Sequence, residues 1–411
     1  MTLNRRLIAA SAAVASLAAC GNPNEPPPVP LSELPRPLSA AEGKLVTAGN
    51  IFSFALFDRV SGAQPAENIF ISPLSASLAL GMTMNGAAGE TLSEMRSALG
   101  LGGASENEVN EGYRDLKTLL LTLDPGTQLG IANSVWYLDT FPFEQSFFTA
   151  ARTYFDAEVT GLDFWSPTAL PTINGWVARA TNDRIPKVLD RIEDDSRMFL
   201  INALYFKGVW QHQFNPAETR QQPFTSVDGT KAEVPLMHQD GEFRYLQAPE
   251  VQIVELPYGN TAFTMTVLLP APDRDINEFA ASLTPELFNS WLDALGETKL
   301  SVDLPRFTLS YGRELNDELK ALGMEKAFVP DGADFTRMSP LGRALFIQFV
   351  KQDTFVAVDE VGTEAAAVTT VGVSVTSAPP AIRVDRPFVF AIRERFSGTI
   401  LFIGKIVRLP A

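Results

Sequence analysis

The sequence predicts a single α+β domain, and three observations support this prediction. Helical patterns gather in the first part of the chain and strand patterns in the second, which is typical of α+β folds. A hydrophobic fraction of 45% in 411 residues is enough for a large buried core. No internal repeat is visible and no clear linker follows residue 40, which favours one domain over several.

The N-terminus has the pattern of an export signal. Arg5 and Arg6 precede a run of apolar or small residues from 7 to 19, which is too short to span a bilayer comfortably but typical of a signal-peptide core. The run ends Leu17-Ala18-Ala19-Cys20, which resembles a bacterial lipobox. We therefore expect residues 1–19 to be removed and the thiol of Cys20 to be lipidated. The alternative is an ordinary secretory cleavage site beside an incidental cysteine.

A lipidated Cys20 predicts an exported protein that is anchored to the bacterial cell envelope or its extracellular surface. Gly21 rather than Asp follows the cysteine, so we expect the outer membrane in a bacterium with two membranes. Residues 21–38 contain seven prolines and no hydrophobic periodicity. Residues 20–39 are therefore expected to be a disordered tether, and residues 40–411 to be the folded domain.

Helices are predicted where apolar residues recur at helical spacing or where caps stand. Residues 40–61 fit an amphipathic helix. Pro73 suits the first turn of a second helix, which Ser72 would cap. Residues 91–99 and 106–123 indicate further helices, each followed by Gly or Pro. The last of these has only two basic residues, so we do not expect it to bind a polyanion such as heparin.

Strands are predicted later in the chain. Residues 197–206 and 345–358 are rich in Phe, Val, Ile and Leu, which is typical of long buried strands. Residues 251–256 and 262–269 are expected to pair around the turn Tyr258-Gly259-Asn260.

The segment from residue 360 to 380, EVGTEAAAVTTVGVSVTSAPP, is the most informative part of the chain. It has no charge and no proline from 365 to 377. Taken with period 2, one face is small and then apolar, which suits a strand with one buried side. That face comprises Thr363, Ala365, Ala367, Thr369, Val371, Val373 and Val375. On this segment alone, an Ala/Val-rich linker or an ordinary edge strand is the alternative.

Charge and composition exclude several classes of function. The formal charge is −15 for the whole chain, which argues against nucleic acid or an anionic membrane surface as a partner of the folded body. One cysteine permits no internal disulfide, and the two histidines, His212 and His238, have no metal-ligand spacing. No HExxH, GxxxxGK or GxSxG motif occurs. We expect no metal, no cofactor and no enzymatic activity.

The segment at 360–380 and its flanks resemble the reactive-centre loop of the serpins, a family of serine protease inhibitors. Other family motifs follow in order over roughly residues 40 to 410. They are Asn68 to Ser75 (NIFISPLS), Asn202 to Trp210 (NALYFKGVW), Glu255 to Tyr258 (ELPY), Leu304 to Phe307 (LPRF), Arg386 to Ile392 (RPFVFAI) and Leu401 to Lys405 (LFIGK). The resemblance implies about nine helices, three sheets and a loop exposed at one pole.

The resemblance also implies a mechanism, in which a protease cleaves the loop and forms an acyl-enzyme. The loop then inserts into the central sheet and traps the protease. The family's loop length, counted from Gly362 to Pro387, places the cleaved bond between Thr376 and Ser377, with Val375 as the next candidate. A β-branched, uncharged Thr376 suits elastase-like or subtilisin-like serine proteases rather than trypsin-like ones. Cysteine proteases are a further class of target, and the inhibitor is expected to be a monomer.

Three groups of residues take roles from the resemblance. The hinge that enters the sheet first comprises Glu360, Gly362, Thr363, Glu364, Ala365, Ala366 and Ala367, and its inward positions are small and uncharged. At the sheet entrance, the breach, Trp210 lies beside Arg306, which is expected to pair with Glu360. Beneath the sheet, the shutter comprises Ser72, Ser75, Asn202 and Gln352, where the last replaces a histidine common in the family.

Two alternatives to an inhibitor remain open from the sequence. A non-inhibitory relative that acts as a binding protein or a plain protease substrate is favoured by charged or bulky hinge residues, which this chain lacks. A Ser/Lys hydrolase would have to use Ser72, Ser75 and scattered lysines, with no base spaced beside them. The sequence does not name the target protease.

Overall fold

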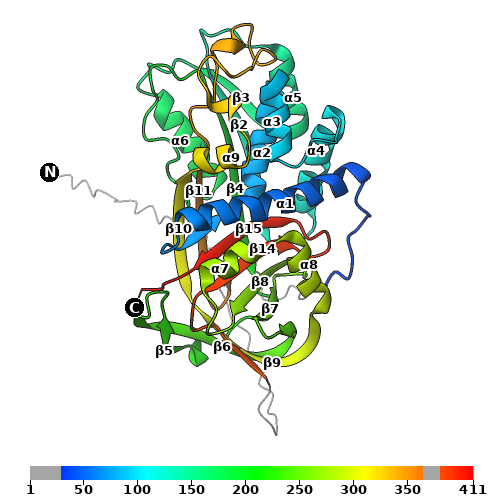
Figure 1. Cartoon of the computed structure of the whole chain (residues 1–411), viewed down its shortest axis with the longest axis vertical. Coiled ribbons are helices and arrows are strands. Elements are labelled where there is room, and N and C mark those ends of the chain that lie inside the picture. Colours follow the sequence, from blue (N-terminus) through cyan, green and yellow to red (C-terminus); the bar gives the residue numbers. More distant parts are fainter. Residues whose placement is uncertain (1–28, 364–379, 411) are drawn as a thin grey trace, which may run out of the picture.

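The computed structural model describes residues 29–363 and 380–410 of the chain. Nine α-helices lie in this part (Figure 1), as the resemblance implied. They are α1 (Ala40–Ala63), α2 (Pro73–Met84), α3 (Gly89–Ala98), α4 (Glu106–Thr122), α5 (Gln145–Phe155), α6 (Ala169–Ala180), α7 (Ile276–Ser282), α8 (Pro285–Ala294) and α9 (Asn316–Ala321), with short 3-10 turns at Pro216–Glu218, Lys326–Phe328 and Gly342–Ala344.

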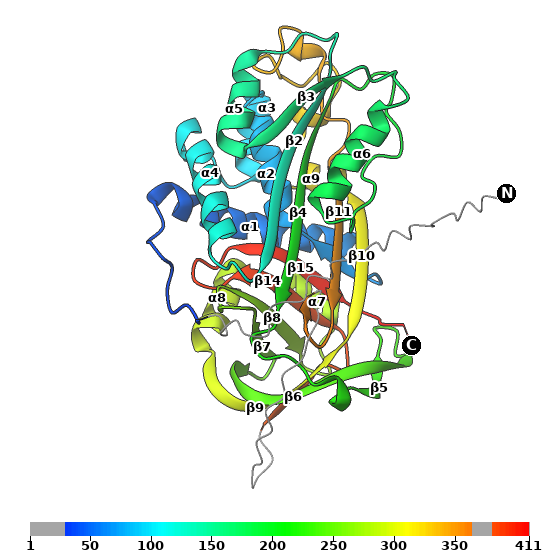
Figure 2. The same cartoon turned by 180° about the vertical axis from the view of Figure 1, so that it is seen from behind.

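A six-stranded sheet forms the long axis of the molecule (Figure 2). Its order is β10 (Phe307–Glu314), β11 (Lys351–Val358), β12 (Gly362–Thr363), β4 (Met198–Val209), β2 (Gln128–Leu138) and β3 (Ala157–Leu162). β10 pairs antiparallel with β11, and β4 pairs antiparallel with β2 over ten residue pairs without a bulge. The short β12 lies between β11 and β4. Among the described residues, a middle strand therefore joins β11 and β4 only where Val358 and Gly208 lie.

A second sheet of nine strands lies at the other end of the molecule. Its order is β1 (Ile69–Ile71), β15 (Ile400–Ile406), β14 (Phe388–Glu394), β8 (Phe263–Pro270), β7 (Val251–Pro257), β6 (Lys231–Gln247), β9 (Gly296–Pro305) and β13 (Ala381–Arg383), with β5 (Arg220–Thr225) also paired to β6. The resemblance implied three sheets. Hydrogen bonding joins two of them here because β6 is one continuous strand of 17 residues that pairs with β9, β5 and β7.

Helices cover both faces of the six-stranded sheet. On one face, α2 packs against β4 and against β15, and α1 crosses beneath it (Figure 1). On the other face, α6 packs against β2 and β4, over a separate apolar cluster that contains Trp136, Trp176 and Phe199 (Figure 2). Helices therefore cover both faces of the sheet at β4, but Met198, Leu200 and Asn202 remain partly exposed.

The helix starts follow the expected capping chemistry. Ser72 accepts a hydrogen bond from the backbone N–H of Ser75, and Pro73 occupies the first turn of α2. Ser39 and Ser105 begin α1 and α4 with complete capping boxes.

The strand predicted over residues 345–358 is shorter than expected, and β11 begins only at Lys351. On one side its partner β10 ends at Glu314, because α9 starts shortly afterwards. On the other side, among the described residues, β11 pairs only at Val358 with Thr363. Residues 345–350 therefore lack the neighbouring strands that would make them part of the sheet.

The prediction of a disordered tether up to residue 39 is wrong for its last part. The N–H of Leu31 donates to the carbonyl of Asn260 at 2.7 Å, and the hydroxyl of Thr261 donates to the carbonyl of Leu31 at 2.9 Å. Leu31, Leu34 and Leu38 pack against the main core. Three leucines at this spacing bury enough apolar surface to hold a proline-rich segment on the domain.

An ion pair fixes the same segment to the first helix. The guanidinium of Arg36 donates to both carboxylate oxygens of Glu42, at 2.7 Å and 2.6 Å, and the Glu42 side chain is fully buried. The hydrogen bond from Arg36 lowers the pKa of Glu42. The segment from Leu31 to Ser39 is thus part of the folded domain.

Candidate functional site

The candidate site is the entrance to the six-stranded sheet, where β12 lies between β4 and β11. Gly362 and Thr363 pair with Val209 and Gly208 of β4, and Thr363 also pairs with Val358 of β11. Thr363 is only 3% exposed. Gly362 lies so close to β4 that an added Cβ would meet the carbonyl oxygen of Gly208 at 2.1 Å, so only glycine fits there. The first residues of the hinge are already strand residues.

Tyr258 holds the first inserted side chain. Its ring stacks on Trp210, with centroids 4.4 Å apart, and its hydroxyl lies 2.8 Å from the hydroxyl of Thr363. Complete burial raises the pKa of Tyr258 far above its ordinary value. The phenol therefore stays neutral and able to donate, and an uncharged, hydroxyl-bearing residue at position 363 matches it.

Trp210 fixes the turn that leads into β12. The indole N–H donates to the carbonyl of Asp359 at 2.8 Å, and the backbone N–H of Trp210 donates to the carbonyl of Val361 at 2.8 Å. The N–H of Phe214 donates to the carbonyl of Glu360 at 2.8 Å. These bonds hold the turn from 359 to 361 and direct the chain between the two strands.

The expected pair of Arg306 and Glu360 is present at the entrance, but it is not the tightest contact. Nη1 of Arg306 lies 3.4 Å from Oε1 of Glu360, and the Arg306 side chain is half exposed. The hydroxyl of Thr219 donates to the same oxygen at 2.8 Å. Sequence reasoning missed Thr219, because nothing in the sequence places the start of β5 beside this glutamate.

The shutter residues meet beneath the middle of the sheet. The side chain of Gln352 accepts from the N–H of Ser72 at 2.9 Å and donates to the carbonyl of Ser72 at 2.7 Å. The Ser72 hydroxyl donates to the carbonyl of Leu401 at 2.8 Å, and the Ser75 hydroxyl donates to the carbonyl of Asn202 at 3.4 Å. The amide of Gln352 thus joins β11 to the start of α2 without a titratable group.

Asn202 also belongs to this cluster, and one of its side-chain atoms has no hydrogen-bond partner within the described ranges. Its side-chain N–H donates to Oδ1 of Asn133 at 2.8 Å, across the β4–β2 pair. Its Oδ1 is buried and accepts no hydrogen bond within the described ranges 29–363 and 380–410. The contribution of Asn133 was also missed, since only the register of β2 against β4 places it opposite Asn202.

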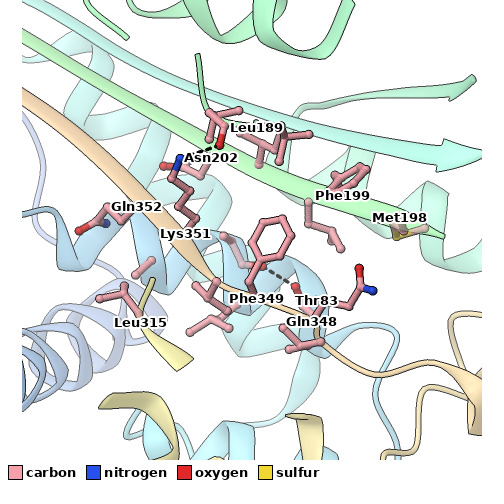
Figure 3. Close-up of a pocket in the computed structure, with 18 of the residues that line it drawn as sticks. Thr83, Leu189, Met198, Phe199, Asn202, Leu315, Gln348, Phe349, Lys351 and Gln352 are labelled. Carbon is pink, nitrogen blue, oxygen red and sulfur yellow. Dashed lines mark hydrogen bonds between the residues drawn. The ribbon is translucent and has the colours of Figure 1, made fainter. Parts of the chain in front are cut away.

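A slot continues from β12 between β4 and the chain that leads into β11. It contains a cavity of about 340 Å³ lined by residues 198–203 on one side and 344–353 on the other (Figure 3). The rings of Phe199 and Phe349 approach each other across it, with centroids 6.1 Å apart. On the α6 side, Nζ of Lys351 donates to the carbonyl of Val188 at 3.0 Å. The cavity lies between the same two chain segments that flank Thr363, further along each of them.

Several predicted residues lie outside the described part of the chain. These are Cys20, the hinge residues Glu364, Ala365, Ala366 and Ala367, and the proposed cleavage bond Thr376-Ser377. Their anchors are described on both sides. Thr363 is held in the six-stranded sheet, and the carbonyl of Pro380 accepts from the N–H of Ser301 at 3.0 Å, next to β13 of the other sheet.

Within the described ranges, no group of three or more His, Cys, Asp or Glu side chains is placed to hold a metal ion. No helix there has the length and hydrophobicity needed to cross a bilayer.

Comparisons with known proteins agree with this geometry. The model of the family described as serpin (serine protease inhibitor) matches residues 47–409. Neuroserpin of Gallus gallus is 33% identical over 372 residues, which cover 87% of this chain and 90% of that protein. The native-state crystal structure of Tengpin, a thermophilic serpin, has 32% identity and a TM-score of 0.82, and covers 93% of this chain and 97% of that one.

Human thyroxine-binding globulin complexed with thyroxine has the same fold, with 27% identity, a TM-score of 0.82, and coverage of 90% of this chain and 100% of that one. A family model that spans almost the whole folded part, together with a hinge already held between two strands, shows that the chain belongs to the serpin family.

Proposed function

We propose that the protein is a suicide-substrate inhibitor of serine proteases. The observation that supports this most directly is the position of Thr363, which pairs with both β11 and β4, the two segments between which a cavity lies further along the sheet. The family as a whole is one of serine protease inhibitors. A hinge that already begins a strand is competent to continue it.

The chemical step belongs to the protease. Its serine hydroxyl attacks the carbonyl carbon of Thr376, the peptide bond to Ser377 breaks, and the proton passes to the leaving amine of Ser377. The product is an ester between the protease and Thr376. In an ordinary substrate, water then releases the ester. In this protein, cleavage separates the part of the loop that ends at Thr376 from its attachment at Pro380.

The two anchors explain why cleavage triggers insertion. The sixteen residues 364–379 run between Thr363 in one sheet and Pro380 beside the other. While the chain is intact, insertion beyond the first residues would require β13 to leave the second sheet. The uncleaved fold is therefore kinetically trapped. Cleavage removes that restraint without disturbing either sheet.

The energy available from insertion is large compared with the stability of a domain. Some ten or more new strand residues would gain ladder hydrogen bonds at about 1 kcal/mol each, together with burial of Ala and Val side chains, which gives about 10–20 kcal/mol. Ordinary domains are stable by about 5–15 kcal/mol. Insertion can therefore drag the acylated protease along the sheet and distort its active site before water reaches the ester.

The test is incubation of residues 21–411 with pancreatic elastase, followed by a denaturing gel and intact mass. We expect a covalent adduct that survives boiling, and release of a peptide that begins at Ser377. Cleavage at this bond with active elastase and no adduct would identify a plain substrate. If the cleaved protein also melts no higher than the intact protein, the insertion mechanism itself is wrong.

We further propose that the protein acts as a monomer at the bacterial cell envelope, tethered through Cys20. Because the chain is docked on the domain from Leu31, the link to the lipid would be shorter than the whole proline-rich segment. Metabolic labelling with an alkyne fatty acid in a bacterial host should label the wild-type chain and not the Cys20→Ser variant. Equal labelling of both would exclude this cysteine as the lipid attachment site.

A further inference from the structure

The turn that follows Tyr258 connects the N-terminal part of the domain with the hinge. The docked segment, residues 31–39, runs from the start of α1 along the side of the domain and contacts this turn (Figure 1). We propose that Thr261 is a positioning residue for the hinge and that the docked segment holds it in place. Its effect on inhibition rests on the proposed function, whereas its effect on the hinge is measurable in the uncleaved protein.

Thr261 has a backbone conformation that a threonine rarely adopts. Its φ is 73°, in the left-handed region, where the branched Cβ is crowded against the backbone. A residue other than glycine stays in such a conformation only where its surroundings hold it there. Thr261, which is buried, therefore needs contacts that offset this strain.

The docked segment supplies two of these contacts through Leu31. The hydroxyl of Thr261 donates to the carbonyl of Leu31 at 2.9 Å, and the N–H of Leu31 donates to the carbonyl of Asn260 at 2.7 Å. The rest of the segment is fixed to the domain by its other leucines and by the ion pair to α1 described above. Leu31 is thus a firmly held support for the strained residue.

The other side of the same turn carries the contacts to the hinge. The N–H of Thr261 donates to the carbonyl of Tyr258 at 2.7 Å, and the hydroxyl of Tyr258 lies 2.8 Å from that of Thr363. The N–H of Gly259 donates to the carbonyl of Val209 at 2.9 Å, at the end of β4 that pairs with the hinge. The position of Tyr258 therefore depends on the conformation of the turn.

The turn has little room to adjust on its side away from the hinge. Gly259 lies so close to Asp124 that an added Cβ would meet Oδ2 of this carboxylate at 2.1 Å. The side-chain N–H of Asn260 donates to the carbonyl of Leu123 at 2.8 Å. The turn therefore cannot relax toward Asp124, and a change of φ at Thr261 would be passed on to Tyr258.

Loss of support at Thr261 should therefore loosen the hinge. β12 has only two residues, so the fraction of molecules in which it is paired depends on few contacts. If a smaller fraction has the paired hinge, the rate at which insertion begins falls by the same factor. The docked segment thus favours trapping of the protease without touching the loop.

The test compares Thr261→Val with Thr261→Gly in the full, uncleaved chain. Valine keeps the branched side chain and removes the hydroxyl, whereas glycine removes the hydroxyl and also the strain. Amide hydrogen exchange is measured at Trp210 and Phe214, whose N–H groups donate to the turn before β12. We expect exchange about fivefold faster than in the wild type for Thr261→Val, and within about twofold of it for Thr261→Gly. Equal acceleration in both variants would overturn the proposal, because strain would then play no part.

Leu31→Pro tests the support from the side of the docked segment, because proline has no N–H to donate to Asn260. In the wild-type background it should accelerate exchange about fivefold, and in the Thr261→Gly background it should have no further effect. The same acceleration in both backgrounds would show that Leu31 does not act through Thr261, and the proposal would be wrong.

Reaction with elastase gives the functional measurement. Thr261→Val and Leu31→Pro should each consume about fivefold more molecules per protease trapped than the wild type, whereas Thr261→Gly should not. An uncleaved Leu31→Pro chain that no longer reacts with elastase would overturn the proposal, since the docked segment would then restrain insertion instead of supporting the hinge. A wild type that forms no adduct would refute the proposed function alone, and the exchange result would still decide the role of Thr261.

Discussion

Replacing Thr363 with arginine is expected to convert the protein from an inhibitor into a substrate. The wild type should trap elastase at near-equimolar ratio. The Thr363→Arg variant should need at least roughly tenfold more molecules per protease trapped, since each 1.4 kcal/mol shifts the partition tenfold. Most of the variant should be recovered as cleaved chain beside active protease.

The reason lies in the surroundings of residue 363. The side chain is 3% exposed and lies against the neutral hydroxyl of Tyr258, between β4 and β11. Within residues 29–363 and 380–410, the hydrogen bond shown for its side chain is to the neutral Tyr258 hydroxyl, so a buried arginine would cost several kcal/mol. The first rung of the new strand must form before the others. Loop insertion therefore becomes slower than hydrolysis of the ester, and the protease is released in active form.

Glu364→Arg is the matched control, with the same charge one position later. If a strand continued beyond Thr363 with alternating faces, residue 364 would lie on the opposite face, and the natural residue there is already charged. This variant should remain an inhibitor. The measurement for both is the ratio of adduct to cleaved chain on a denaturing gel. Equal loss in the two variants would mean that added charge, rather than burial at position 363, is responsible.

Thermal melts separate this effect from misfolding. The intact Thr363→Arg protein should melt close to the wild type, because β12 has only two residues and can leave the sheet at little cost. After cleavage, the variant should lack most of the rise in melting temperature expected for the wild type. A full rise would show that the arginine is accommodated, and the argument from Tyr258 would fail.

Helix starts and buried strands could be predicted from the sequence because they depend on residues that are neighbours along the chain. Ser72 before Pro73 specified a capped helix start, and the apolar run at 197–206 specified a buried strand. The docked segment at 31–39 was missed, although Leu31, Leu34 and Leu38 recur at intervals of three and four residues. Their prolines suggested disorder, and the binding surface on Asn260 and Thr261 comes from a distant hairpin.

In the candidate site, only the residues that belong to family motifs could be predicted from the sequence. Arg306 and Glu360 were expected to pair and lie 3.4 Å apart, whereas the indole of Trp210 binds the carbonyl of the adjacent Asp359. Thr219 and the ring pair of Phe199 and Phe349 could not be expected, because each contact joins segments whose separation is decided by strand register. Register depends on the whole sheet, and a shift of one residue would reverse every face.

Thr376→Arg is the second substitution with a large expected effect, because it changes which protease attacks the loop. Association with elastase should fall by at least roughly a hundredfold, and inhibition of trypsin should appear where the wild type shows none. A shallow apolar pocket excludes a long charged side chain, whereas the trypsin pocket contains an aspartate that binds it. The measurement is the second-order rate of inhibition of each protease.

Thr376→Val is the control that preserves shape and removes the hydroxyl. It should inhibit elastase within a fewfold of the wild-type rate, because the pocket recognises small apolar bulk. Val375→Arg tests the neighbouring register. If that variant gains trypsin inhibition while Thr376→Arg does not, the cleaved bond lies one residue earlier than proposed.

The location of the bond matters for the trap as well as for specificity. In the proposed mechanism, the new strand would start at Thr363 and the protease would be attached at its far end, on residue 376. The segment 364–375 is long enough to pass the shutter at Asn202 and reach the base of the slot beside Met198. A bond several residues earlier would leave the ester in the middle of the sheet, where the protease would block its own translocation. A trypsin-trapping Thr376→Arg protein would therefore support both the specificity and the length of the inserted strand.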